Sequence, residues 1–313
     1  TLFSEKIQEL KDRIASVIVG QEQMVDLVLT AVLANGHVLI EGVPGVAKTL
    51  LARLTARLID ADFSRIQFTP DLMPSDVLGT TVFNMKTNEF DFHQGPIFAD
   101  IVLVDEINRA PAKTQAALFE VMEERQISID GITHKMGELY TILATQNPVE
   151  QEGTYKLPEA QLDRFLMKIT MDYPSLEEEV NILERHHTNA SLIKLDDIKP
   201  AITKEELLSL RALMNQVFVD RTLLQYIALI VQQTRTSKAV YLGASPRASV
   251  AMLQSSKAYA LLQGRDFVTP EDIKFVAPYV LQHRLILTAE AEMEGYSPVK
   301  VTQRLIDKVE VPK

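Results

Sequence analysis

Short apolar runs alternate with helical patterns along the first half of the chain. The runs at 101–104 and 139–145 are mostly apolar, which is typical of parallel strands buried on both faces. Helical patterns at 50–58 and 112–125 follow two of the runs, and such alternation predicts an α/β fold with a parallel sheet. The five predicted strands are residues 37–40, 64–69, 101–104, 139–145 and 168–171.

Two further segments predict hairpin inserts in this core. Residues 80–98 alternate aromatic and polar positions around a polar turn at 86–89. The second insert, near residues 125–137, has Asp130-Gly131 between two short strands, and this dipeptide favours a two-residue hairpin turn.

The pattern changes at Tyr173-Pro174, beyond which strand signals nearly vanish and helix-capping pairs recur. We therefore expect an α/β core over residues 1–173 and an all-α domain over 174–313. The capping pairs are Ser175 with Glu178, Thr203 with Glu206, and Thr269 with Asp272. The predicted helices are residues 176–187, 204–217, 221–236, 246–263 and 270–281.

Composition excludes several classes of protein. Hydrophobic residues make up 46% of the 313 residues, which is enough to form hydrophobic cores. It has no cysteine, so disulfides and thiolate metal sites are excluded. A net charge of -10 argues against a dominant nucleic-acid surface. No run approaches a membrane span and the N-terminus does not read as a signal peptide, so we expect a cytoplasmic protein without a membrane span.

The most informative motif lies between the strand at 37–40 and the helix at 50–58. It reads Gly42-Val43-Pro44-Gly45-Val46-Ala47-Lys48-Thr49, and in this setting backbone N–H groups and the helix N-terminus bind phosphate. Lys48 would reach the β- and γ-phosphates, and the Thr49 hydroxyl would ligate Mg²⁺. Ala47 stands where the usual pattern has its second glycine. The plain alternative is an ordinary turn with a surface lysine.

Two other strand ends carry polar residues suited to the same chemistry. Asp105-Glu106 follows a buried strand, so Asp105 would hold Mg²⁺ and Glu106 would polarise the attacking water. Asn147 follows the next strand and is able to orient a water or contact the γ-phosphate. For Asn147 alone, a plain Asn-Pro turn is the favoured interpretation.

The roles of two arginines depend on the residues around them in the fold. Arg164 lies at the end of a predicted short helix at 158–165, before the last predicted strand. Arg247 lies in the first turn of a helix that Ser245 is expected to cap, where a cation opposes the helix dipole. A bound phosphate would justify that position, and the alternative is an acidic partner on the protein.

Taken together, these segments closely resemble the MoxR family of AAA+ ATPases, in order along most of the chain. The match begins at Ile18-Val19-Gly20-Gln21 and reaches the helices of the second domain. The segments that carry it are residues 42–49, 104–110, 145–148, 151–155, 158–165 and 243–248.

The resemblance implies a role for each motif. Lys48 and Thr49 would be Walker A, Asp105 and Glu106 Walker B, and Asn147 sensor 1. Arg164 would be an arginine finger acting on a neighbouring subunit, and Arg247 sensor 2 from an all-α lid domain. Val19 and Gly20 would line the adenine, and the nucleotide would contact Gly42, Val43, Pro44, Gly45, Val46, Ala47, Lys48, Thr49 and Leu50.

The resemblance also implies ATP and Mg²⁺ as cofactors and a hexameric ring, with the two inserts facing its pore or a partner. Members of this family are chaperone-like and act in maturation or metal insertion, typically with a partner that carries a von Willebrand factor A domain. Arg109 is a further candidate for an interface.

Three other functions stay open. A small-molecule kinase is disfavoured by the long helical domain and the lack of an obvious second substrate pocket. A nucleic-acid motor is disfavoured by the acidic balance and the lack of a basic, aromatic-interleaved stretch. Only the presence of Glu106, which would polarise the attacking water, argues against a nucleotide-gated scaffold with little turnover.

Overall fold

The computed structural model describes residues 2–17, 22–42, 48–147, 155, 157–188 and 195–313. Its centre is a five-stranded parallel sheet in the order β2-β5-β8-β1-β9, which confirms the α/β prediction. Because all five strands run the same way, their carboxyl ends share one edge. The strands are β1 Val38–Gly42, β2 Phe63–Gln67, β5 Ile101–Asp105, β8 Thr141–Gln146 and β9 Met167–Met171.

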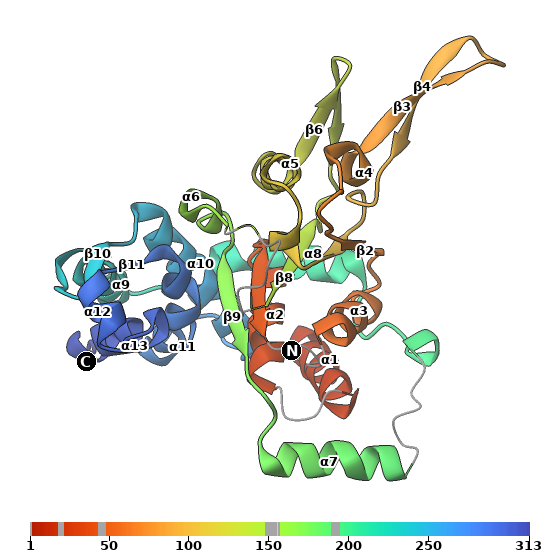
Figure 1. The fold of residues 1–313 in the computed structure, drawn as a ribbon. Coiled ribbons are helices and arrows are strands. Elements are labelled where there is room, and N and C mark those ends of the chain that lie inside the picture. Colours follow the sequence, from red (N-terminus) through yellow and green to blue (C-terminus); the bar gives the residue numbers. More distant parts are fainter. Residues whose placement is uncertain (1, 18–21, 43–47, 148–154, 156, 189–194) are drawn as a thin grey trace.

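Helices cover both faces of this sheet (Figure 1). Side chains alternate along β1, so Val38 and Ile40 join one buried cluster with α2 and α3 while Leu39 joins another with α5. Burial on both faces explains why the central strand β5 is an almost continuous apolar run. The helices of this part are α1 Leu2–Val17, α2 Glu22–Leu33, α3 Lys48–Leu58, α4 Pro74–Leu78, α5 Ala112–Glu124 and α6 Glu159–Leu162. Helix α6 is shorter than the predicted 158–165.

Both predicted hairpins are present and project from the same end of the core (Figure 1). Asp130 and Gly131 both have positive φ, at 52° and 78°, as expected for the two-residue turn. The hairpins contact each other: the ring of Phe92 stacks on His134 at 4.3 Å, and Thr81 donates a hydrogen bond to Asp130. They comprise β3 Gly79–Asn84 with β4 Glu89–Gln94, and β6 Gln126–Ile129 with β7 Ile132–Lys135.

The second half of the chain is mainly helical, as predicted. Ser175 and Thr269 form complete capping boxes, and Thr203 accepts the expected bond from the Glu206 N–H. The helices are α7 Leu176–His187, α8 Lys204–Leu213, α9 Arg221–Thr236, α10 Pro246–Leu262, α11 Pro270–Leu281, α12 Ala289–Met293 and α13 Pro298–Lys308. The sequence pattern missed α12, α13 and a small ribbon of β10 Val240–Leu242 with β11 Ile286–Leu287.

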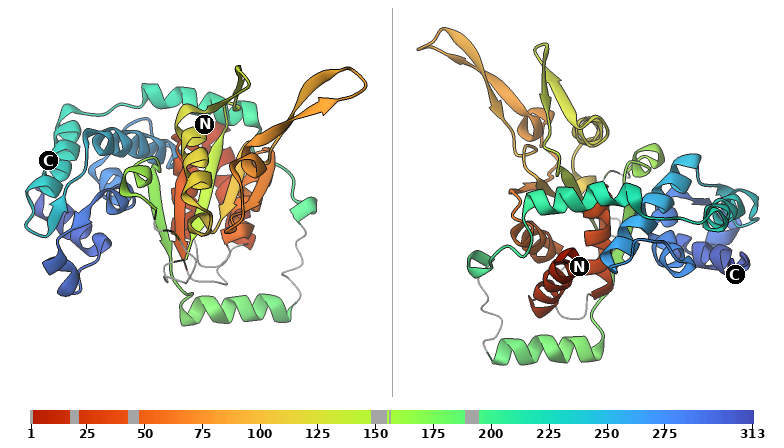
Figure 2. Two further views of the ribbon diagram at one scale, coloured as in Figure 1. Left: turned by 45° about the horizontal axis from the view of Figure 1, so that its top comes forward. Right: turned by 180° about the vertical axis from the view of Figure 1, so that it is seen from behind.

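Helix α8 lies across the core, while α9 to α13 form a body beside β9 (Figure 2). Arg211 of α8 donates hydrogen bonds to the carbonyl oxygens of Val32 and Glu138, which ties this helix to the core. The division at residues 173 and 174 stays a prediction.

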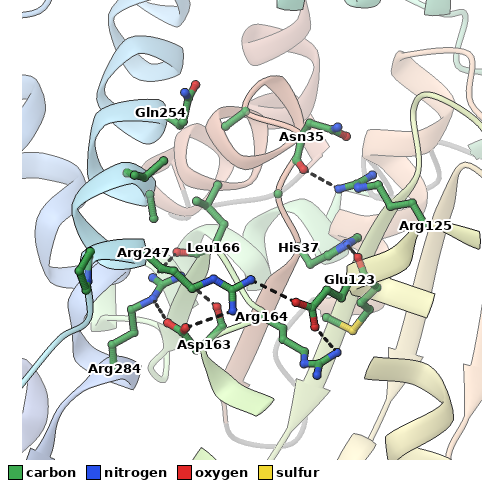
Figure 3. A pocket seen from close by; sticks show the side chains of 16 residues that line it. Asn35, His37, Glu123, Arg125, Asp163, Arg164, Leu166, Arg247, Gln254 and Arg284 are labelled. Atoms are coloured by element: carbon green, nitrogen blue, oxygen red, sulfur yellow. Dashed lines mark hydrogen bonds and ion pairs between the residues drawn. The ribbon is translucent and has the colours of Figure 1, made fainter. Parts of the chain in front are cut away.

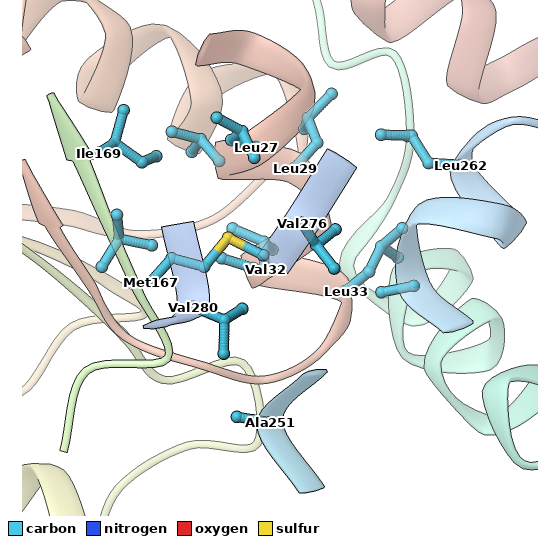
Figure 4. Close-up of a cluster of buried hydrophobic side chains, with 14 of the residues drawn as sticks. Leu27, Leu29, Val32, Leu33, Met167, Ile169, Ala251, Leu262, Val276 and Val280 are labelled. Carbon is cyan, nitrogen blue, oxygen red and sulfur yellow. The ribbon is translucent and has the colours of Figure 1, made fainter. Parts of the chain in front are cut away.

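A single hydrophobic cluster joins this helical body to the core (Figure 4). Helix α10 packs on α2, and α11 packs on β9. Leu27 of α2 and Val276 of α11 belong to the same cluster, and both are buried. Helices α9–α13 are therefore held to the sheet by apolar contacts.

The shared cluster predicts a strong effect of truncating Leu27, which is 1% exposed. Leu27→Ala should lower the free energy of unfolding by about 2–5 kcal/mol, because it removes buried methyl groups and leaves a cavity. Denaturant titration followed by circular dichroism and tyrosine fluorescence should show one shifted transition. The control Leu229→Ala, at a position 48% exposed, should change the value by less than about 0.5 kcal/mol. Equal effects of the two substitutions would contradict this packing.

Candidate functional site

The carboxyl edge of the sheet brings several of the predicted residues together. Lys48 begins α3, and its ammonium donates a hydrogen bond to the carbonyl oxygen of Gly42 at 3.1 Å. Burial lowers the pKa of Lys48, while the charges of Asp105 and Glu106 raise it. Both carboxylates therefore lie close enough to act on this ammonium.

Part of the predicted nucleotide site lies outside the described residues. These are Val19 and Gly20, predicted to line the adenine, and the turn of Val43, Pro44, Gly45, Val46 and Ala47. Gly42, Thr49 and Leu50, which flank the turn, belong to β1 and α3.

The carboxylate of Asp105 is buried at the end of β5 and has partners on both oxygens. Oδ1 accepts a hydrogen bond from the Thr145 hydroxyl at 2.9 Å. Oδ2 accepts one from Arg65 Nε at 2.8 Å, and Arg65 Nη2 lies 2.5 Å away. Asp105 is thus held in place, and it already faces a cation.

Glu106 has a left-handed backbone, with φ of 52°, which is uncommon for a residue other than glycine. Its N–H donates to the Thr145 hydroxyl at 3.1 Å. Its carboxylate accepts a hydrogen bond from Gln67 at 2.9 Å and pairs with Arg109 at 3.2 Å. Arg109, a candidate for an interface, here binds Glu106 of its own chain.

Asn147 directly follows β8 and so lies at the same edge, half buried. The preceding Gln146 donates to the Glu41 carboxylate at 2.9 Å, and Lys168 pairs with that carboxylate at 3.2 Å. These bonds connect β8, β1 and β9 next to Asn147.

Three residues at this edge were missed by sequence reasoning: Thr145, Arg65 and Gln67. Thr145 ends the predicted strand 139–145, so its position was a usable signal, whereas Gln67 lies inside the predicted strand 64–69 and ends β2 only in the structure. Their partners could not be predicted from the sequence, because Gln67 lies opposite Asp105 only through the pairing register of β2 and β5.

The two candidate arginines lie at the opposite, amino edge of the sheet, around a cavity of about 540 Å³ (Figure 3). Arg164 precedes β9, and its Nη1 lies 2.5 Å from the Glu123 carboxylate. His37, which precedes β1, lines the same cavity. Since β1 and β9 are parallel, both residues mark the edge where these strands begin.

Arg247, in the first turn of α10, reaches this same group. Its guanidinium pairs with Glu123 at 3.3 Å and with Asp163 at 3.7 Å. It therefore has the acidic partners that were the alternative to a phosphate. Ser245 occupies the N-cap position, as predicted, but its side chain makes no capping hydrogen bond.

The predicted residues thus divide into two groups. A strand of five residues separates the two edges by roughly 15 Å. Lys48, Asp105 and Glu106 lie at one edge, and Arg164 and Arg247 at the other. No group of three or more His, Asp or Glu side chains suited to a metal ion occurs among the described residues.

Two histidines beside the arginines are buried and uncharged. His37 Nε2 lies 3.0 Å from the Met122 carbonyl oxygen, and its Nδ1 accepts from the Ile142 N–H. Only the neutral ring with its proton on Nε2 satisfies both contacts. Burial and the charge of Arg125 lower the pKa of His37 to about 3. Burial also lowers the pKa of His283 well below its usual value.

None of the helices in the described part of the chain combines the length and apolar character that a membrane crossing needs.

Known proteins resemble this chain in sequence and in fold. Residues 37–167 match the ATPase family associated with various cellular activities (AAA), and residues 232–307 match the AAA lid domain. The protein YeaC of Bacillus subtilis is 47% identical, over 96% of this chain and 93% of its own length. The chaperone MoxR1 of Mycobacterium tuberculosis is 45% identical, over 95% of this chain and 80% of its own. A crystal structure of a candidate ATPase from Cytophaga hutchinsonii has a TM-score of 0.91 and 41% identity, covering 100% of this chain and 96% of that one.

The bonds of the Thr145 hydroxyl predict that it is needed for stability. Thr145→Val removes the acceptor of the Glu106 N–H and a donor to Asp105, and should lower the free energy of unfolding by about 1–3 kcal/mol. Denaturant titration measures this loss. Thr145→Ser keeps the hydroxyl and should retain most of the stability. A valine variant as stable as the parent would show that these bonds contribute nothing.

The buried histidines predict a loss of stability in acid. Because the folded-state pKa of His37 is below its unfolded value of 6.5, its contribution is complete above pH 6.5 and falls as the pH drops toward 3. One such histidine should cost about 1 kcal/mol between pH 8 and pH 5.5. His37→Gln should flatten this dependence in urea titrations, whereas the exposed His93→Gln should not. An unchanged slope in His37→Gln would refute the assignment.

Proposed function

The chain belongs to the MoxR family of AAA+ ATPases, and we propose that it hydrolyses ATP where two copies of it meet. The observation that carries this proposal is the separation of its two charged groups across the sheet. With roughly 15 Å between the edges, Arg164 and Arg247 cannot reach phosphates held beside Lys48 of their own chain. A neighbouring copy must supply them.

The carboxyl edge binds the nucleotide in this proposal. Residues 42–50 surround the phosphates, and Val19 and Gly20 line the adenine. Lys48 approaches the β- and γ-phosphates, and the N-terminus of α3 adds favourable partial positive charge. Because burial disfavours the charged form of Lys48, an anion beside it stabilises that form.

Thr49 and Asp105 are the proposed ligands of Mg²⁺. Their oxygens are the hard donors that this ion prefers, and the Asp105 carboxylate is already held beside the cation Arg65. When bound, the ion neutralises charge on the phosphates. Thr145 keeps the Asp105 carboxylate in position.

Glu106 is the proposed group that polarises the attacking water, and Asn147 orients that water. The Glu106 carboxylate is already fixed by Gln67 and Arg109, so its direction is set before ATP binds. Such preorganisation is what a positioned general base requires.

Arg164 and Arg247 are proposed to stabilise the phosphoryl group of the neighbour during transfer. In their cluster, the three arginines Arg164, Arg247 and Arg284 share two carboxylates, Glu123 and Asp163, so the net charge is 3 - 2 = +1. A surplus cation at the surface favours an incoming anion. An arginine supplied in this way increases the rate roughly 10³–10⁵-fold in other NTPases.

We further propose a hexameric ring with a core over residues 1–173 and a lid over 174–313. The relative MoxR1 is named a chaperone, which supports a chaperone-like action on client proteins. We extend this proposal to maturation or metal insertion as the form of that action, and to a partner that carries a von Willebrand factor A domain. The exposed apolar residues Phe83, Met85 and Phe90 of the first hairpin suit contact with protein.

Catalysis between subunits predicts complementation. Arg164→Ala keeps its own nucleotide site, and Glu106→Gln keeps its arginines, so each variant alone should bind ATP. Hydrolysis should be roughly 10³–10⁵-fold slower without the arginine and roughly 10²–10⁴-fold slower without the group that activates water. A 1:1 mixture should recover about a quarter of the parent rate, since an intact site meets an intact arginine at that share of random interfaces.

The rate of phosphate release from ring-sized fractions measures the recovery. Arg221→Ala, at an exposed position on α9, is the control and should keep the parent rate. A mixture no faster than its components, or full activity of Arg164→Ala alone, would contradict catalysis between subunits.

A further inference from the structure

Glu123, in the last turn of α5, faces two arginines that come from distant parts of the chain (Figure 3). Its Oε2 lies 2.5 Å from Arg164, and its Oε1 accepts a hydrogen bond from Arg247 at 3.3 Å. Each oxygen of one carboxylate thus meets a different arginine. Neither the sequence motifs nor the family resemblance gave this residue a role.

Helix α5 holds Arg164 at two points. Besides Glu123, the Arg164 Nη1 donates to the carbonyl oxygen of Phe119, one turn earlier, at 2.9 Å. The next residue, Phe165, packs edge-on against the Phe119 ring at 6.0 Å. The negative end of the helix dipole also favours a cation here. The position of Arg164 is therefore set by α5.

Arg247 depends more strongly on its carboxylates. It is 63% exposed, and in the first turn of α10 it opposes the dipole of its own helix. Only Glu123 and Asp163 pair with it among the described residues. Asp163 is in turn fixed by Arg284, whose side chain is 5% exposed and lies 2.7 Å away.

These contacts leave both arginines able to bind an anion. A guanidinium has five N–H donors. Within the described residues, Arg164 uses only Nη1 for its two partners, so Nε and Nη2 remain for another ligand. Glu123 therefore orients Arg164 without occupying all of it.

We propose that Glu123 is a positioning residue that holds Arg164 and Arg247 together as a pair for the nucleotide of the neighbouring subunit. This inference rests on the proposed hydrolysis between subunits. The carboxylate offsets the repulsion between two cations that must approach the same phosphate. Glu123 acts through the arginines and makes no contact with the nucleotide itself.

The complementation mixture tests this role on one side of the interface. Glu123→Gln is added to the Glu106→Gln chain, which donates the arginines to its Arg164→Ala partner. The kcat for ATP should fall between about tenfold and about a hundredfold, because a small displacement of a catalytic group is costly. The KM should stay within about twofold, since the nucleotide-binding edge is untouched.

The same substitution placed on the Arg164→Ala chain should leave the rate unchanged, because the arginine pair of that chain is already broken. Glu123→Asp keeps the charge and should restore part of the kcat. Glu124→Gln is the matched control: this neighbouring residue forms no ion pair with the described part of the chain and should keep the parent rate.

Thermal unfolding and light scattering check that each variant folds and forms rings. If Glu123→Gln does not form rings, the test uses Glu123→Asp instead, and its kcat is compared with that of Glu124→Gln. Equal kcat values for these two variants would overturn the proposal. The proposal would also be overturned if Glu123→Gln lowered the kcat equally on either chain of the mixture, left it unchanged or raised it. If the mixture of Arg164→Ala and Glu106→Gln without any Glu123 substitution fails to hydrolyse ATP, the proposal of catalysis between subunits is refuted. The role of Glu123, which rests on that proposal, is then refuted as well.

Discussion

The parallel direction of five strands is the constraint on which the rest of the structure depends. It gathers every strand's carboxyl end at one edge and every amino end at the other. The carboxyl edge carries Lys48, Asp105 and Glu106, and the amino edge carries Arg164. Because side chains cannot span a strand's length, the proposed catalytic groups of one chain are divided between its two edges.

Helix α5 connects the two halves. It begins shortly after Glu106, runs for 13 residues or roughly 20 Å, and ends at the carboxylate that meets both arginines. Helix α10 brings Arg247 to the same point, and the apolar cluster shared with α2 keeps α10 against the core. Core packing and electrostatics therefore act together, since the cluster that joins the helical body to the sheet also sets the position of Arg247.

Much of this fold was predictable from the sequence for identifiable reasons. Strands buried on both faces are continuously apolar, Asp130-Gly131 specifies its turn, and capping residues mark Ser175 and Thr269 as helix starts. Helix α13 was missed although Ser297 and Pro298 mark its start. The ribbon of β10 and β11 was missed because strands of three and two residues carry almost no pattern.

The candidate site was predictable only where a motif is local. Asp105 and Glu106 lie together in sequence, but the Thr145 and Gln67 that hold them are about 40 positions away. Glu123 is a more extreme case, because its partners come from elements about 40 and 124 positions away. Such pairs are set by sheet register and helix packing, which one sequence does not display.

The most direct test of catalysis between subunits is the ATPase rate per subunit against protein concentration, with light scattering on the same samples. The account predicts a rate that is low for dilute single chains and rises in step with the fraction assembled. A rate per subunit that is already full in dilute samples without assembly would contradict it, because one chain would then complete its own site.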